Sequence, residues 1–156
     1  RFRVTFPPAA ATAVEAPSPE QPEAPQLSPR LRALFIDDHP RFLASLRLAI
    51  ADKLDMAAES SGRAALLRLK NGEPFDAVVC DLMMPDFTGM DLYEAVAAEV
   101  PAMLPKMVFM TGGAYTERAQ EFLATVPNPR VEKPFRPDEL VQLLTRLCAP
   151  EARSYH

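Results

Sequence analysis

The sequence predicts an α/β protein in which helices cover both faces of a doubly wound, five-stranded parallel sheet. From residue 31 onward, short apolar segments alternate with segments whose apolar residues recur at helical spacing. Two of the apolar segments, Ala77–Asp81 and Lys106–Met110, are almost continuously apolar, as strands buried on both faces must be. Short loops join the elements, which favours parallel strands connected by helices.

The first half of this unit begins with a short strand. Leu31–Ile36 is apolar and ends on an acidic pair, and a helix over Pro40–Lys53 follows, with proline in its first turn. Its apolar residues keep helical spacing: Leu43, Leu46, Ile50 and Leu54. Met56–Glu59 is a weaker second strand. Ser60 and Ser61 are candidate N-caps for a second helix that ends near Gly72.

The second half repeats the alternation. Ala77–Asp81 is the third strand, and Thr88 with Asp91 forms a capping signature for a helix that ends near Val100. Lys106–Met110 is the fourth strand and Thr116–Ala124 a short helix. The fifth strand is Arg130–Lys133. A last helix begins at Pro137 and carries four leucines on one face: Leu140, Leu143, Leu144 and Leu147.

Composition limits the classes of function. The 156 residues allow one ordinary domain with a tail, and 48% of them are hydrophobic and 24% charged. The net charge of −4 argues against a nucleic acid or a membrane surface as the main partner. Two cysteines, Cys80 and Cys148, are too few for a disulfide framework and indicate reduced thiols. Since no apolar run approaches the roughly 20 residues of a membrane span, we expect a soluble cytoplasmic fragment.

The amino-terminal segment has a different texture. Seven of the 17 prolines fall within the first 29 residues. Residues 8–30 are rich in Pro, Ala and Glu and predict an extended linker, because they offer too little apolar surface to form a core. Residues 1–7 alternate polar and apolar side chains, a pattern that by itself indicates no more than a tail. The domain proper spans residues 31–148, and residues 149–156 form a short second tail.

Polar residues follow or end four of the predicted strands. The set is Asp37, Asp38, Asp81, Thr111 and Lys133. A parallel sheet brings its carboxyl ends to one edge, where ligands bind, although Asp81 taken alone could equally cap a loop. Three converging carboxylates call for a hard cation such as Mg²⁺. A hydroxyl and an ammonium beside it suit phosphoryl oxygens, so one carboxylate becomes a candidate nucleophile that forms an aspartyl phosphate.

Residues 31–148 resemble a response-regulator receiver domain. The family's pieces occur in its order and at its separations: the acidic pair, Asp81-Leu-Met-Met-Pro85, Thr111-Gly112 and Lys133-Pro134. The resemblance implies a flavodoxin-like (βα)5 fold with strand order 2-1-3-4-5. It implies that Asp81 is the phosphoacceptor, and that Asp38, Asp81 and the backbone carbonyl of Met83 ligate Mg²⁺ while Asp37 positions the ion. Thr111 and Lys133 would contact the phosphoryl oxygens, with a cis Lys133–Pro134 bond.

The resemblance also suggests partners. Residues 2–7 are similar to the last strand of the ATP-binding domain of histidine kinases, and a proline-rich linker from there into a receiver is the layout of a hybrid histidine kinase. The phosphodonor would be a kinase phosphohistidine, in the same chain or another, and a histidine phosphotransfer domain could be the next acceptor. The fragment itself would catalyse only its own phosphorylation and dephosphorylation, while the parent chain could be anchored in a membrane.

Several positions depart from the family pattern or need comment. Arg130 stands where receivers carry an inward-swinging tyrosine or phenylalanine, and we expect a surface arginine there. Met83 and Gly113 would flank the path of the attacking water. His39, beside Pro40, is expected to be an exposed cap of the first helix and not a metal ligand. Tyr115, with the helix that follows it, would belong to the face that changes on phosphorylation.

Two other functional classes remain open. A degenerate receiver would bind partners without phosphate, and Arg130 keeps that alternative alive although all five polar residues are present. An aspartyl-phosphate phosphatase of the haloacid-dehalogenase type would need a second acid two residues after its nucleophile. Met83 occupies that position, which counts against a phosphatase.

Overall fold

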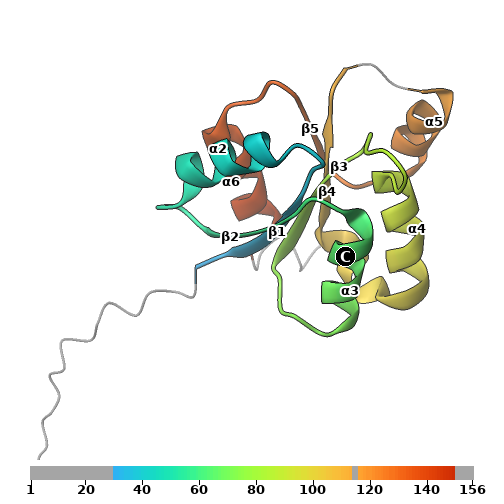
Figure 1. Ribbon diagram of the computed structural model, residues 1–156, viewed down its shortest axis with the longest axis horizontal. Coiled ribbons are helices and arrows are strands. Elements are labelled where there is room, and N and C mark those ends of the chain that lie inside the picture. The colour runs from blue at the N-terminus through green and yellow to red at the C-terminus, as the bar shows by residue number, and fades with distance from the viewer. Residues whose placement is uncertain (1–29, 114–115, 150–156) are drawn as a thin grey trace, which may run out of the picture. The chain divides into compact units, whose positions relative to one another are not determined.

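A computed structural model describes residues 30–113 and 116–149, and in it five parallel strands form one sheet (Figure 1). The strand order β2-β1-β3-β4-β5 is the predicted one. In chain order the elements are β1 Arg32–Ile36, α2 Pro40–Ile50, β2 Asp55–Glu59, α3 Gly62–Lys70, β3 Ala77–Asp81, α4 Gly89–Glu99, the 3₁₀ helix η3 Pro101–Lys106, β4 Met107–Thr111, α5 Glu117–Thr125, β5 Arg130–Glu132 and α6 Pro137–Leu147.

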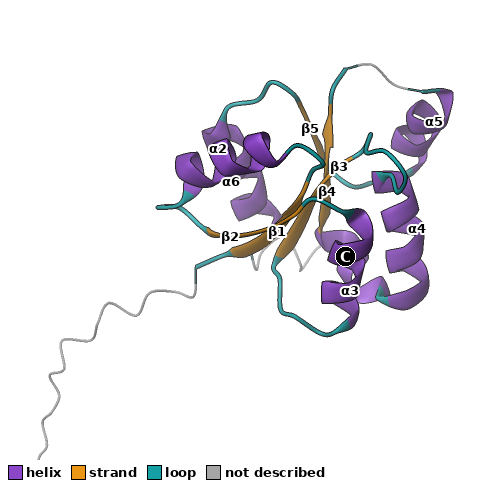
Figure 2. Cartoon of the chain, in the orientation of Figure 1, coloured by secondary structure: helices purple, strands orange, loops and turns teal. Residues whose placement is uncertain are grey.

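Helices cover both faces of the sheet. Helices α2 and α6 lie on one side, and α3, α4 and α5 on the other (Figure 2). Successive residues of the three central strands belong to opposite cores: in β1, Leu34 packs with the α3, α4 and α5 side and Phe35 with the α2 and α6 side. All residues of β3 and β4 are buried, which explains why their sequences lack the alternation of a half-exposed strand.

Side-chain caps set the starts of three helices. Thr88 and Asp91 form the predicted capping box at α4, the hydroxyl of Ser61 accepts the N–H of Ala64 at α3, and Thr116 caps α5 through Ala119. Each of these side chains satisfies an N–H group that has no partner inside the helix. The sequence therefore specifies where these helices leave the carboxyl edge of the sheet.

The boundaries differ from the predicted ones in a few places. Helix α2 ends at Ile50 and not at Lys53; a turn follows, in which the N–H groups of Lys53 and Leu54 both donate to the carbonyl of Ile50. The sequence analysis missed η3, which begins at Pro101 and takes Lys106 from the predicted fourth strand. That strand is shifted by one residue, to Met107–Thr111, so Thr111 is the end of β4 itself.

Some predictions concern residues outside the described ranges. These are the kinase-like segment 1–7, nearly all of the linker 8–30, Tyr115 and most of the tail 149–156. Among the described residues, no helix has the length and apolar character that crossing a membrane requires. Both cysteines are free thiols, and Cys80 is buried in β3 as expected.

Candidate functional site

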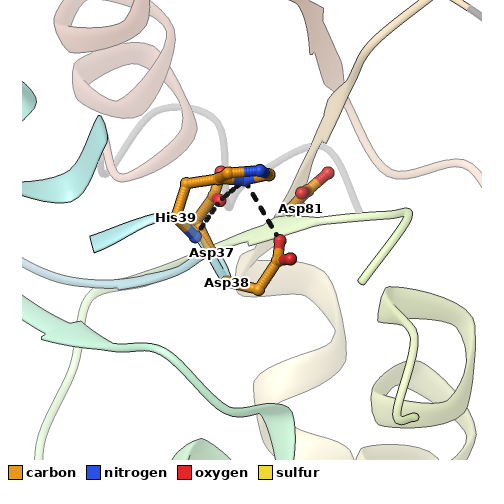
Figure 3. Close-up of side chains that lie close together, drawn as sticks. All are labelled: Asp37, Asp38, His39 and Asp81. Atoms are coloured by element: carbon orange, nitrogen blue, oxygen red, sulfur yellow. Dashed lines mark hydrogen bonds and ion pairs between the residues drawn. The ribbon is translucent and has the colours of Figure 1, made fainter. Parts of the chain in front are cut away.

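The predicted site residues come together at the carboxyl edge of the sheet. Asp37 and Asp38 follow β1, Asp81 ends β3, and Lys133 follows β5. Ligand atoms of both aspartates of the pair, of His39 and of Asp81 all lie within 4.8 Å of one another (Figure 3). The backbone N–H of Lys133 donates to the carbonyl of Thr111 at 2.7 Å, so the ends of β4 and β5 are adjacent there.

Asp37 is fully buried, and cationic or N–H donors occupy both of its oxygens. Its Oδ2 accepts a hydrogen bond from Nζ of Lys133 at 2.5 Å. Its Oδ1 lies 2.9 Å from the backbone N of His39 and 3.0 Å from Nδ1 of the same residue. Such partners offset the cost of burying a carboxylate, and here they hold the side chain in place. Asp37 therefore organises the site: its Oδ2 is committed to Lys133, and its Oδ1 faces His39.

Asp81 is the buried acid of the crevice, with 6% of its surface exposed. Burial raises the pKa of its carboxyl, and the charges of Asp37 and Asp38 add to that rise. Lys133, whose Nζ lies 3.7 Å from Oδ2 of Asp81, and the N–H of Met83, which donates to Oδ1 at 3.3 Å, lower the same pKa. A further positive charge near Asp81, such as a metal cation, would therefore stabilise its ionised form.

Asp38 shows most directly that a cation fits. Its Oδ1 is buried, yet it has no hydrogen-bond partner among the residues that the structure describes. Nδ1 of His39 lies 3.3 Å from this oxygen. Carboxylate oxygens of Asp38 and Asp81 with no strong donor of their own suit a hard divalent cation such as Mg²⁺. The all-oxygen ligand set proposed from the sequence is compatible with these side chains, and the carbonyl of Met83 as its third member stays a prediction.

A glycine fixes the backbone beside Asp81. A Cβ atom on Gly89, the first residue of α4, would lie 2.8 Å from the carbonyl oxygen of Asp81 and 2.9 Å from Cα of Leu82. In addition, the N–H of Gly89 donates to the carbonyl of Leu82 at 3.0 Å. The start of α4 therefore packs directly on the chain that leaves β3, and only glycine permits this approach.

Thr111 and Arg130 occupy the β4 and β5 side of the site. Thr111 is buried, and its hydroxyl donates to the carbonyl of Val131 at 3.4 Å, so a contact with a phosphoryl oxygen would require the hydroxyl to rotate. Arg130 is exposed, as the sequence analysis expected. The Lys133–Pro134 bond is cis, also as expected.

Sequence reasoning missed two contacts. The ring of Phe42, from α2, lies 4.4 Å from Nζ of Lys133, an amino–aromatic contact that helps to fix the lysine. His39 is exposed as predicted, but its side chain does not cap α2, and its Nδ1 faces Asp37 and Asp38. The hydrogen bond with Asp37, helped by the charge of Asp38, raises the pKa of His39. Its position next to the acidic pair was the available signal.

Comparisons with known proteins agree with this geometry. The response regulator receiver domain family model matches residues 33–145. The DNA-binding response regulator MtrA of Mycolicibacterium smegmatis is 31% identical over 72% of this chain and 48% of its own length. The virulence sensor protein BvgS of Bordetella pertussis is 35% identical over 94% of this chain, which spans only 12% of that protein. A response regulator receiver protein from Sinorhizobium medicae superimposes with a TM-score of 0.64 at 27% identity, over 76% of this chain and 94% of that one.

Proposed function

Because this chain belongs to the response regulator receiver domain family, we propose that the carboxylate of Asp81 accepts a phosphoryl group from a phosphohistidine. Phosphoacceptance is the role of the family, and the assignment of the acceptor to Asp81 is our proposal. The observation that carries it is the position of Asp81 at the end of the central strand β3, buried, 3.7 Å from the ammonium of Lys133.

In the proposed reaction, an oxygen of Asp81 forms a bond to phosphorus while the bond from phosphorus to the histidine nitrogen breaks. The departing nitrogen keeps the electron pair of that bond. Lys133 supplies positive charge beside the phosphoryl oxygens, and its contacts with Asp37 and Phe42 hold it ready. Mg²⁺, held by Asp38, Asp81 and the Met83 carbonyl with Asp37 as positioning residue, would neutralise charge on the same oxygens.

The response to phosphorylation begins at Thr111 in this proposal. Its hydroxyl leaves the carbonyl of Val131 and donates to a phosphoryl oxygen, which biases an existing conformational equilibrium. The ring that accompanies this hydroxyl in the family has no counterpart at its usual position, which holds the exposed Arg130. The signal at the β4 and β5 face therefore depends on the backbone between Thr111 and Lys133 and not on burial of a ring.

The length of one match supports a larger parent protein. The similarity to the Bordetella sensor protein covers 94% of this chain, more than the 72% covered by the DNA-binding regulator, and so extends beyond the receiver. We infer that this segment is the receiver of a hybrid sensor histidine kinase and that it belongs to the cytoplasmic part of that protein. Its partners would be the kinase domain that carries the phosphohistidine, in the same or another chain, and a histidine phosphotransfer domain.

Intact mass after incubation with acetyl phosphate tests the proposal. We expect one phosphoryl adduct that requires Mg²⁺ and is absent from Asp81→Asn. Asp76→Asn is the matched control, because Asp76 accepts the N–H of Arg32 before β3 begins, away from the carboxyl edge. An adduct that persists in Asp81→Asn would refute the assignment of the acceptor. A folded protein that forms no adduct and does not bind beryllofluoride with Mg²⁺ would favour the degenerate, partner-binding receiver.

A further inference from the structure

We propose that His39 gives this site a second ligand set, in which Nδ1 of His39 and the carboxylates of Asp37 and Asp38 bind a transition metal such as Zn²⁺. The family's ion is held by oxygen ligands alone. An imidazole nitrogen among the same carboxylates changes which metals the crevice prefers. The consequence for signalling rests on the proposed function, since a metal bound in this way would exclude the Mg²⁺ that phosphorylation of Asp81 needs.

The distances match the edges of a coordination shell. Nδ1 of His39 lies 3.0 Å from Oδ1 of Asp37 and 3.3 Å from Oδ1 of Asp38. Nitrogen and oxygen ligands sit about 2.0–2.2 Å from Zn²⁺, so neighbouring ligands of a tetrahedral or octahedral ion are roughly 3.0–3.5 Å apart. Both distances from Nδ1 fall in this range, and the ligand atoms of Asp37 and Asp38 lie within 4.8 Å of each other, so a metal ion between the three atoms would draw the two carboxylates together. The nearest carboxylate oxygen of Asp81, within 4.8 Å of all of them, is available as a fourth ligand.

The orientation of the ring supports ligation through Nδ1. Figure 3 shows the imidazole of His39 lying over the acidic pair, with dashed contacts from its nitrogen to both side chains. The side chain is 69% exposed, so an ion can enter from solvent without opening the core. The oxygen of Asp38 that faces this nitrogen is the buried Oδ1, which has no hydrogen bond among the described residues and is therefore free to accept a metal ion.

The choice of metal follows from ligand chemistry. Mg²⁺ prefers oxygen ligands and gains little from an imidazole, whereas Zn²⁺, Ni²⁺ and Cu²⁺ bind imidazole nitrogen well. Oδ2 of Asp37 stays paired with Lys133, which leaves Oδ1 to face His39. The same carboxylates would then serve either cation, and His39 would decide the preference. We expect micromolar Zn²⁺ to compete with Mg²⁺ at this site.

Isothermal titration calorimetry tests the inference. The wild-type protein, His39→Gln and His156→Gln are each titrated with Zn²⁺ and, separately, with Mg²⁺. We expect one Zn²⁺ site in the wild type, and a ratio of Zn²⁺ to Mg²⁺ affinity that falls about tenfold or more in His39→Gln. His156→Gln, which changes the only other histidine of the sequence, should bind Zn²⁺ as the wild type does.

The opposite results separate this inference from the proposed function. An unchanged affinity ratio in His39→Gln, or loss of the Zn²⁺ site in His156→Gln, would overturn the inference whatever happens at Asp81. Replacing Asp38 by asparagine must weaken Zn²⁺ as well, and a site that survives that change is located elsewhere. If the wild type forms no Mg²⁺-dependent phosphoryl adduct, the proposed function is wrong instead, and that experiment contains no Zn²⁺.

Discussion

The two ends of the sheet treat charge in opposite ways. At the amino end, the guanidinium groups of Arg32 and Arg68 meet Glu73 at 2.8 Å and 2.5 Å, and both lie over the ring of Phe75. Arg68 donates to both oxygens of Glu73, and Arg32 donates to Oε2 as well. Asp76 accepts the backbone N–H of Arg32. In this cluster each charged group faces an opposite charge or a donor.

The carboxyl end is not balanced in the same way. Asp37, Asp38 and Asp81 converge there on Lys133, which is closely paired with Asp37 alone. Asp38 has an oxygen without a hydrogen bond, and the pKa of Asp81 is raised by its burial. Charges that repel one another in a fold are retained when a ligand needs them, at the expense of stability. The comparison therefore locates the binding site in the region where charge is uncompensated.

The largest effect on stability should come from the glycine that shapes this end. Gly89→Ala forces a Cβ against the backbone of Asp81 and Leu82, so we expect a loss of about 2 kcal/mol in the free energy of unfolding, with slower phosphorylation. At the amino end, Gly72 has a φ of +81° but open space around it, and Gly72→Ala should cost about 1 kcal/mol. Urea denaturation measures both. Equal losses, or a larger loss for Gly72→Ala, would contradict the close packing at Asp81.

The next effect should differ in sign between the two ends. In buffer without divalent cations, Asp81→Asn removes a buried, repelled carboxylate and should raise the free energy of unfolding by about 1 kcal/mol. Glu73→Gln removes the shared partner of two arginines and should lower it. The urea midpoints of the two variants, compared with the wild type, report the signs. A destabilised Asp81→Asn would mean that Lys133 already compensates the three acids.

Most of the site at the carboxyl end of the sheet could be predicted from the sequence. Apolar runs ending on Asp37, Asp81 and Thr111 are local patterns, and a parallel sheet brings their ends together without further information. The helix starts were predictable for the same reason, since the capping of α4 by Thr88 and Asp91 depends on residues three positions apart.

The contacts that sequence reasoning missed join residues that are far apart in the chain. Lys133 meets Phe42 of α2, and Arg32 meets Glu73, 41 residues away. Such pairs depend on the relative position of elements, which periodicity does not encode. The turn at Leu54 and the helix η3 were missed for another reason: an apolar residue at helical spacing also fits a turn, and short 3₁₀ segments have no periodic signal.

The smallest effect tests whether an acid outside the crevice is balanced even at the carboxyl end. Asp91, in the first turn of α4, accepts the N–H of Thr88 and pairs with Arg118 of α5 at 2.9 Å, and both contacts lower its pKa. A folded pKa below the unfolded value of about 3.9 means that the ionised side chain stabilises the protein above that pH, and that this contribution is lost as the pH falls through the folded pKa.

Asp91→Asn should therefore cost about 0.5 kcal/mol at neutral pH, as expected for a charge near a helix amino terminus, and almost nothing in acid. Urea midpoints of wild type and variant at both pH values measure the gap. Glu94→Gln is the matched control, because Glu94 is 3.7 Å from Arg118 and mostly exposed, and it should change little at either pH. A gap for Asp91→Asn that is the same at both pH values would show that the charge of Asp91 contributes nothing, and that its geometry as a cap is the whole effect.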